Sequence, residues 1–197
     1  MSNNGKLELI VGPMFSGKSS EIIRRIRIFK IINKKVLVIK PRIDNRYNDN
    51  NDNNDNNDNN DNKITSHNFE TAECVCLDLL SELKNVSDYD NIIIDEGQFF
   101  NDLKDTVIKW LDEYNVNIII SGLDGDFEKN PIGQILSLIP HAEKCIKLNS
   151  LCNICNDGTE APFSFRKVSS KNKILVGGVE AYIPVCRKHY NNLTMLN

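Results

Sequence analysis

Long apolar runs are absent from this sequence of 197 residues. No stretch reaches the roughly 18 consecutive apolar residues that indicate a membrane-spanning helix. The first residues, MSNNGKLELIV, also lack the basic segment and extended apolar core of a secretory signal peptide. We therefore expect a soluble, cytoplasmic protein that makes no contact with a membrane.

A strong excess of charge is absent as well. The formal net charge is −3, and residues 48–62 carry five Asp without any Lys or Arg, which leaves 24 basic and 22 acidic residues, or +2, in the rest of the chain. Nucleic-acid-binding domains usually carry a marked basic patch, so we expect no nucleic-acid partner. Hydrophobic residues make up 40% of the chain, enough for one main domain with a small appendage.

Residues 48–62, NDNNDNNDNNDNNDN, contain no apolar residue at all. A segment of this kind buries too little surface to offset the entropy that ordering costs, so we predict a disordered insertion. A calcium loop is the alternative interpretation of the regular Asp spacing. The EF-hand pattern needs a central Gly and a terminal Glu, and the absence of both disfavours it.

A glycine-rich loop near the N-terminus is the most informative motif. It follows the apolar run Leu7–Val11, precedes a helical pattern and fits G-x-x-x-x-G-K-[ST]. Such a loop binds a polyphosphate through backbone N–H groups, with Lys18 at the β- and γ-phosphates and the Ser19 hydroxyl on Mg²⁺. An accidental glycine turn is the alternative. The loop consists of Gly12, Pro13, Met14, Phe15, Ser16, Gly17, Lys18 and Ser19.

The isoleucine run Asn91–Ile94 delivers two carboxylates, Asp95 and Glu96, at its C-terminal end. An acidic residue at this place in a P-loop fold holds the metal ion, and we assign that role to Asp95. Neighbouring side chains on a strand point to opposite sides, so Glu96 has a different role, such as general base, unless the strand has already ended. A solvated strand end is the alternative for both carboxylates.

The order of elements indicates an α/β fold with a P-loop NTPase-like parallel sheet. A helix predicted over Ser20–Ile32 joins the first strand to a second, Lys35–Lys40, in a parallel, right-handed crossover. A further helix is predicted over Leu103–Tyr114, because apolar residues recur there at helical spacing. It is followed by a buried strand over Val116–Ile120.

Several residues are ambiguous when only their local pattern is considered. Asp44 and Arg46 follow the second strand on the ligand-binding side of the sheet, although solvated loop charges are the more common explanation. Phe127, at the end of a later strand, is a core residue or a platform for a base, and its position favours the core. Cys74 and Cys76 are interpreted as core thiols.

Four other side chains form two pairs with metal-ligand spacing. Cys152 and Cys155 are separated by two residues, as are Cys186 and His189. Two such pairs fit a tetrahedral Cys₃His zinc site, whereas unrelated core thiols are the alternative. The 30 residues between the pairs exceed the usual ribbon spacing, so the intervening segment has a further role.

The change of character near residue 148 predicts two units. Residues 1–148 form the P-loop α/β nucleotide-binding domain, residues 149–192 a small zinc-binding domain, and residues 193–197 a tail. Between the two ligand pairs, Lys173–Tyr182 is a strand-like run that two glycines interrupt and an aromatic residue closes.

These motifs together resemble one enzyme family. GPMFSGKSSE, DNRY, IIIDEGQFF, LDGDF and the paired metal ligands occur here in the order seen in the thymidine kinases of the cellular type, which animals, many bacteria and poxviruses share. The resemblance covers nearly the whole chain apart from the Asn/Asp insertion and the last residues. It implies transfer of the γ-phosphate of ATP to the 5′-hydroxyl of thymidine, with deoxyuridine also accepted, in nucleotide salvage for DNA synthesis.

The resemblance also implies roles for individual residues. Glu96 is the catalytic base, Ser19 and Asp95 serve Mg²⁺, and a structural zinc ion anchors a lasso loop that folds over the base. Besides residues 12–19, the ATP and phosphate site contains Asp44, Asn45, Arg46, Asp95 and Gln98. The nucleoside site contains Met14, Phe99, Leu123, Phe127, Ser164, Lys173, Ile174, Leu175, Val176, Gly177 and Tyr182. The family further implies a homotetramer or homodimer.

Three positions depart from the family pattern. His189 is the fourth metal ligand where many members have Cys, Asp126 replaces a small hydroxyl residue, and Ile132 replaces a frequent aromatic residue. Two other classes of protein fit less well. A nucleotide-dependent switch would need a guanine-reading N-K-x-D motif, and a zinc-ribbon nucleic-acid binder would carry basic residues where Leu175–Tyr182 has none.

Overall fold

The computed structural model of the chain describes residues 5–43, 63–65, 71–168 and 178–196. The Asn/Asp insertion lies outside these residues. Five residues of the expected nucleoside site also lie outside the described ranges: Lys173, Ile174, Leu175, Val176 and Gly177. The same holds for three residues of the expected ATP site, Asp44, Asn45 and Arg46.

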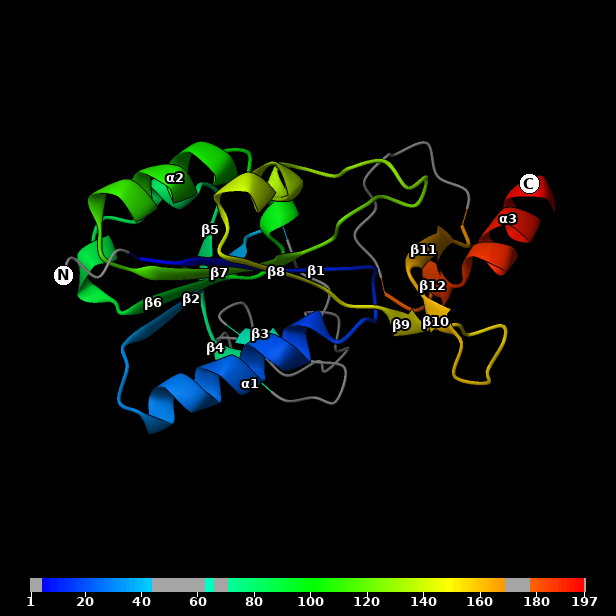
Figure 1. Cartoon of the computed structure of the whole chain (residues 1–197), viewed down its shortest axis with the longest axis horizontal. Coiled ribbons are helices and arrows are strands. Elements are labelled where there is room, and N and C mark those ends of the chain that lie inside the picture. The colour runs from blue at the N-terminus through cyan, green and yellow to red at the C-terminus, as the bar shows by residue number, and fades with distance from the viewer. Residues whose placement is uncertain (1–4, 44–62, 66–70, 169–177, 197) are drawn as a thin grey trace, which may run out of the picture.

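A six-stranded sheet forms the centre of the larger unit (Figure 1). Every pair of neighbouring strands in it is parallel, which confirms the predicted α/β fold. The strands, in their order across the sheet, are β5 (Val75–Leu77), β2 (Val36–Pro41), β6 (Asn91–Ile94), β7 (Asn117–Gly122), β1 (Leu7–Val11) and β8 (Lys144–Lys147). β6 and β7 therefore separate β1 from β2, so the first two strands of the chain are not neighbours in the sheet.

Helices cover both faces of this sheet. α1 (Lys18–Ile31) lies on one face, and α2 (Leu103–Glu113) lies on the other with the 3₁₀ segment η5 (Ile135–His141) (Figure 1). The alternation of side chains along β6 explains both contacts. Ile92 and Ile94 belong to the core on the α2 face, whereas Ile93 belongs to the core on the α1 face. A strand buried on both faces needs the uninterrupted isoleucine run that the sequence contains.

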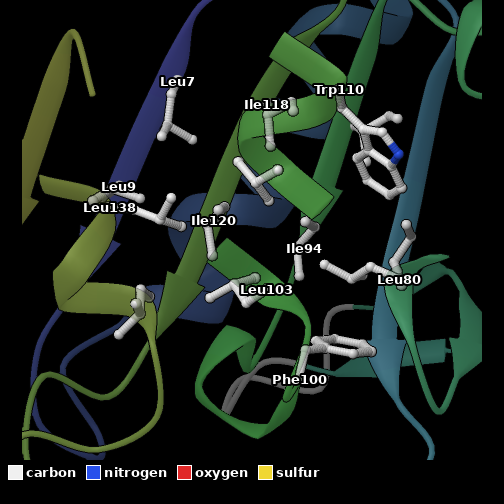
Figure 2. Packing of buried hydrophobic residues seen from close by; sticks show 14 of the residues in the cluster. Leu7, Leu9, Leu80, Ile94, Phe100, Leu103, Trp110, Ile118, Ile120 and Leu138 are labelled. Carbon is white, nitrogen blue, oxygen red and sulfur yellow. The ribbon is translucent and has the colours of Figure 1, made fainter. Parts of the chain in front are cut away.

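The core on the α2 face is the larger of the two. Figure 2 shows Leu103, Phe100 and Trp110 beside the isoleucines of the central strands. Trp110 is 4% exposed, and the indole packs at the end of the sheet toward Leu80. Full burial of one such apolar side chain stabilises the fold by about 1.5–3 kcal/mol. These contacts make the sheet a rigid support for the loops at its carboxyl edge.

A short antiparallel hairpin extends the α1 face. It consists of β3 (Lys63–Thr65) and β4 (Thr71–Glu73), and the segments η2 (Leu80–Glu82) and η3 (Val86–Asp88) follow β5 on the way to β6. Ile64 and Cys74 pack in the core with α1. The prediction that Cys74 is a core thiol is confirmed, and burial raises the pKa of this thiol to about 12.

The C-terminal unit lies beyond the carboxyl end of β1 (Figure 1). It contains two antiparallel pairs, β9 (Ser150–Leu151) with β10 (Glu160–Ala161) and β11 (Phe163–Arg166) with β12 (Tyr182–Val185). α3 (Arg187–Leu196) ends the chain and includes most of the residues that we assigned to a tail. Within the described ranges, no helix is both long and apolar enough to cross a membrane.

Candidate active site

The glycine-rich loop between β1 and α1 closes around the ammonium group of Lys18. The Lys18 Nζ donates hydrogen bonds to the Pro13 carbonyl at 2.6 Å and to the Gly12 carbonyl at 3.2 Å, and the side chain is only 7% exposed. Gly17 precedes the helix with φ of 84°, a left-handed conformation that favours glycine. The loop therefore concentrates positive charge and N–H donors at the start of α1.

The two carboxylates after β6 do not follow strand geometry. The strand ends at Ile94, and Glu96 has φ of 52° and ψ of 42°, so the alternation expected for a strand does not apply to this pair. Asp95 Oδ1 accepts hydrogen bonds from the Glu96 backbone N–H at 3.0 Å and from the Ser121 hydroxyl. These two donors fix one oxygen of the Asp95 carboxylate at the carboxyl edge of the sheet.

Gln98 holds the second carboxylate. This residue lies in η4 (Gly97–Phe99), and its amide nitrogen donates to Glu96 Oε2 at 2.5 Å. The amide oxygen of the same side chain accepts from the Leu123 backbone N–H at 3.0 Å. One amide group thus joins the carboxylate loop after β6 to the loop after β7. Phe99, the next residue, is half-buried in the same 3₁₀ turn.

A cavity of about 640 Å³ extends from the phosphate loop to Glu96 and to the C-terminal unit. Lys18 and Glu96 both line it, so an ammonium group and a carboxylate face the same space. The other lining residues that the sequence had singled out are Met14, Phe15, Ser16, Gly17, Ser19, Leu123 and Tyr182. The cavity therefore brings together residues from both ends of the chain, from Met14 to Pro184.

One end of this site is apolar. Met14, Ala181 and Tyr182 form a buried cluster, and Leu123 and Phe127 pack against it with Phe15. The Met14 backbone N–H donates a buried hydrogen bond to the Ser164 hydroxyl at 2.9 Å. This bond connects the phosphate loop to β11 of the C-terminal unit. The expected phosphate site and the expected nucleoside site are therefore in direct contact through Met14 and Ser164.

The four predicted metal ligands come together. His189 Nδ1 lies 3.4–3.5 Å from the sulfur atoms of Cys152, Cys155 and Cys186, and the sulfur atoms of Cys155 and Cys186 are 3.8 Å apart. Zinc–sulfur bonds of ~2.3 Å and zinc–nitrogen bonds of ~2.0–2.1 Å give tetrahedral edges of roughly these lengths. The donor atoms and their spacing therefore fit a zinc ion.

The electrostatics of Cys152 also suit a metal ligand. Burial opposes ionisation of this thiol, but backbone N–H groups of Cys155, Cys186 and Ile154 lower its pKa to about 6. One of these donors, the Cys186 N–H, lies 3.3 Å from the Cys152 sulfur. A thiolate is the form of cysteine that binds zinc. The backbone N–H groups near the two ligand pairs therefore favour the form of Cys152 that can act as a metal ligand.

Sequence reasoning missed three residues of the site. Ser121 holds Asp95, Arg166 stacks on Phe127 with 3.7 Å between the guanidinium carbon and the ring centroid, and the Tyr190 hydroxyl donates to the Phe127 carbonyl at 2.6 Å. Ser121 was visible as the polar residue that follows the isoleucine run of β7. The alternating FSFR of β11 likewise places Ser164 and Arg166 on one face. Nothing in the local pattern marks Tyr190.

The comparisons with known proteins place the chain in a family. A model of the thymidine kinase family matches residues 5–190. The chain belongs to that family. Thymidine kinase 1 of Dictyostelium discoideum is 40% identical over 192 residues, a match that covers 95% of this chain and 78% of the relative.

Viral members are similar to the same extent. The thymidine kinase of Choristoneura fumiferana entomopoxvirus is 40% identical over 194 residues, covering 97% of this chain and 99% of its own. The thymidine kinase of vaccinia virus strain Western Reserve is 39% identical over 188 residues, covering 95% and 98%. The resemblance that the motifs indicated is thereby confirmed, and it extends through the C-terminal unit.

Proposed function

We propose that this protein is a thymidine kinase that transfers the γ-phosphate of ATP to the 5′-hydroxyl of thymidine, giving dTMP and ADP. The observation that supports this most directly is that one cavity is lined by Lys18, Glu96 and the apolar side chains of Met14, Leu123 and Tyr182. A phosphate-binding cation, a base and an apolar surface for a nucleobase are the three elements that the reaction requires.

Lys18 and the loop amides bind the phosphates of ATP. The contacts of the Lys18 ammonium with the Pro13 and Gly12 carbonyls hold the charge where a β- or γ-phosphate oxygen can become its partner. Asp44, Asn45 and Arg46 are proposed to complete this site on the grounds of the family motif.

Asp95 and the Ser19 hydroxyl would hold Mg²⁺. Carboxylate and hydroxyl oxygens are suitable ligands for this ion, and the hydrogen bonds from Ser121 and Glu96 orient the Asp95 carboxylate. When bound, the ion would supply neutralisation of the negative charge that develops during phosphoryl transfer.

Glu96 accepts the proton of the attacking 5′-hydroxyl. As the bond between this oxygen and the γ-phosphorus forms, the bond to the β-phosphate bridging oxygen breaks and ADP departs. Gln98 restrains the Glu96 side chain through its 2.5 Å hydrogen bond and thereby limits the positions that the base can adopt. Gln98 is thus a positioning residue for the base.

The nucleoside binds at the apolar end of the cavity, where Met14, Leu123, Phe127 and Tyr182 gather. Ser164 and Phe99 are proposed to stand close to the base. The segment Lys173–Gly177 would act as a lasso that covers it and excludes water, which otherwise competes as a nucleophile. A pocket of this kind accepts deoxyuridine as well, because loss of one methyl group costs only about 1–3 kcal/mol.

Zinc has a structural role in this proposal. Four protein ligands leave no open position for water or substrate, so the ion stabilises the C-terminal unit without entering the chemistry. The ligands close both ends of the segment that carries the proposed lasso. We further propose a division into an ATP-binding unit, residues 1–148, and a zinc-binding unit, residues 149–192, and assembly as a homodimer or homotetramer.

An assay with radiolabelled ATP and individual nucleosides tests this function. The purified protein is incubated with [γ-³²P]ATP, Mg²⁺ and thymidine, deoxyuridine, deoxycytidine or deoxyguanosine in turn. We expect label in dTMP and, at a lower rate, in dUMP. Label in inorganic phosphate alone would instead indicate an ATPase, and label in a purine nucleotide alone would reject the nucleoside assignment.

A further inference from the structure

A buried arginine lies behind the apolar end of the site. Arg166 is the last residue of β11 and is only 7% exposed, although arginine side chains are rarely buried without specific partners. It is paired across the hairpin with Tyr182 of β12. Like Phe127, it is absent from the residues that line the cavity, so any effect on a substrate must pass through a neighbour that does line it, such as Tyr182.

The guanidinium group contacts two of the three aromatic side chains of the apolar end, Phe127 and Tyr182. Its carbon lies 3.7 Å from the centroid of the Phe127 ring and 5.7 Å from that of the Tyr182 ring. Its Nη2 donates to the Tyr182 hydroxyl at 3.3 Å. One planar cation therefore fixes the ring of Phe127 and the hydroxyl of Tyr182 at the same time.

Phe127 is also restrained through its backbone. The Tyr190 hydroxyl donates to the Phe127 carbonyl at 2.6 Å, and the carboxylate of Asp126 accepts from the N–H groups of Glu128 and Asn130 at 2.9 and 2.8 Å. With the backbone held in this way, the orientation of the Phe127 ring, set by its side-chain torsion angles, is the main motion that these hydrogen bonds do not restrain. The stacked guanidinium restricts that motion.

We propose that Arg166 is a positioning residue for the nucleoside: by stacking on Phe127 and binding the Tyr182 hydroxyl, it sets the shape of the surface on which the base packs. This inference rests on the proposed function. Lysine cannot replace arginine in this role, because a compact ammonium cannot stack face to face on one ring while it donates along a fixed direction to a second residue. The buried site makes the cation–π contact stronger than it would be in water.

The test compares Arg166→Lys with a matched control, Arg187→Lys. Arg187 also places its guanidinium over an aromatic ring of the C-terminal unit, 4.8 Å from the centroid of Phe163, but that ring belongs to the cluster around the metal ligands. For Arg166→Lys we expect a thymidine KM raised about tenfold, with the ATP KM and kcat changed less than about twofold. The control should match the wild type in all three constants.

Binding measured without turnover gives a second readout. Calorimetric titration with thymidine should show a weakened Kd in Arg166→Lys and an unchanged Kd in Arg187→Lys. Tyr182→Phe removes the hydroxyl that accepts the Arg166 hydrogen bond, so the effect of this change on the thymidine Kd should shrink when Arg166→Lys is already present. Should Arg166→Lys fail to fold, Arg166→Gln, which retains a planar donor, carries the same comparison. Melting temperature and zinc content establish folding.

The possible outcomes separate the inference from the function on which it rests. If the wild type phosphorylates thymidine and Arg166→Lys keeps a normal thymidine KM, the inference is wrong. Equal increases in the KM of thymidine and of ATP would also overturn it, because a general loss of structure has that effect. A wild type that does not phosphorylate thymidine refutes the proposed function instead.

Discussion

Removing the Ser164 hydroxyl tests the connection between the phosphate loop and the C-terminal unit. Ser164 is 7% exposed, and its hydroxyl accepts the Met14 backbone N–H at 2.9 Å across 150 residues of sequence. In Ser164→Ala the buried N–H loses this acceptor. A buried donor left without a partner costs about 1–3 kcal/mol. For a chain of this size, 2 kcal/mol corresponds to a fall in melting temperature of roughly 4–8 °C.

The measurement is the free energy of unfolding in urea, combined with the thymidine KM. Ser164→Thr keeps a hydroxyl and should retain most of the stability, while Ser137→Ala removes an exposed hydroxyl and should have little effect. The thymidine KM of Ser164→Ala should rise because the Met14 side chain belongs to the apolar cluster. A urea midpoint equal to that of the wild type would show that this hydrogen bond does not join the two units in solution.

Three further changes have defined outcomes. Cys152→Ser should reduce the zinc content measured by atomic absorption and raise the thymidine KM more than the ATP KM, and a metal-free, fully active wild type would refute this. The hydrogen bond from Arg24 holds the pKa of Glu21 at about 2, below its usual 4.5, so this stabilisation is complete above about pH 4.5 and lost as the pH falls toward 2. Glu21→Gln should therefore lower the unfolding free energy at pH 7 by under about 1 kcal/mol and have no effect at pH 2; a uniform effect across this range would contradict the assignment. Gly133 has φ of 59°, and an added Cβ would overlap the Gln98 carbonyl, so Gly133→Ala should cost roughly 1–3 kcal/mol in urea unfolding and slow turnover; normal values of both would contradict it.

The parts of the fold that depend on local pattern were predictable. The strand Leu7–Val11 has the predicted bounds, and the helix predicted over Leu103–Tyr114 is observed over Leu103–Glu113. Apolar periodicity indicates which side of an element is buried, and in these two segments no glycine, proline or other local signal opposes it. The helix predicted from Ser20 begins earlier, at Lys18, because the glycine loop itself supplies the first turn.

The arrangement of these elements in space was harder to predict from the sequence. In the observed strand order, β6 and β7 lie between β1 and β2. This order is a property of the whole sheet, and no single crossover connection determines it. The left-handed conformation of Glu96 was also not evident, since it depends on where β6 stops. The local reasoning left open whether the strand ends before Glu96, and the structure shows that it ends at Ile94.

Some parts of the candidate site could likewise be predicted from the sequence, and others could not. The phosphate loop, the carboxylate pair and the four metal ligands carry their spacing within short motifs, so the sequence indicated them. The bond between Met14 and Ser164 and the stacking of Arg166 on Phe127 join segments far apart in the chain. Their partners are selected by the packing of the C-terminal unit against the sheet, and local patterns do not encode that packing.

The most direct test of the proposed chemistry is the rate of thymidine phosphorylation by Lys18→Ala. Lys18 lines the cavity together with Glu96, and loss of its charge stabilisation in the transition state should lower kcat/KM by about a hundredfold or more. Lys34→Ala, which removes an exposed lysine on the opposite edge of the sheet, is the control and should retain wild-type kinetics. If folded Lys18→Ala retains more than about a tenth of the wild-type kcat/KM, Lys18 does not bind the transferred phosphate and the proposed mechanism is wrong.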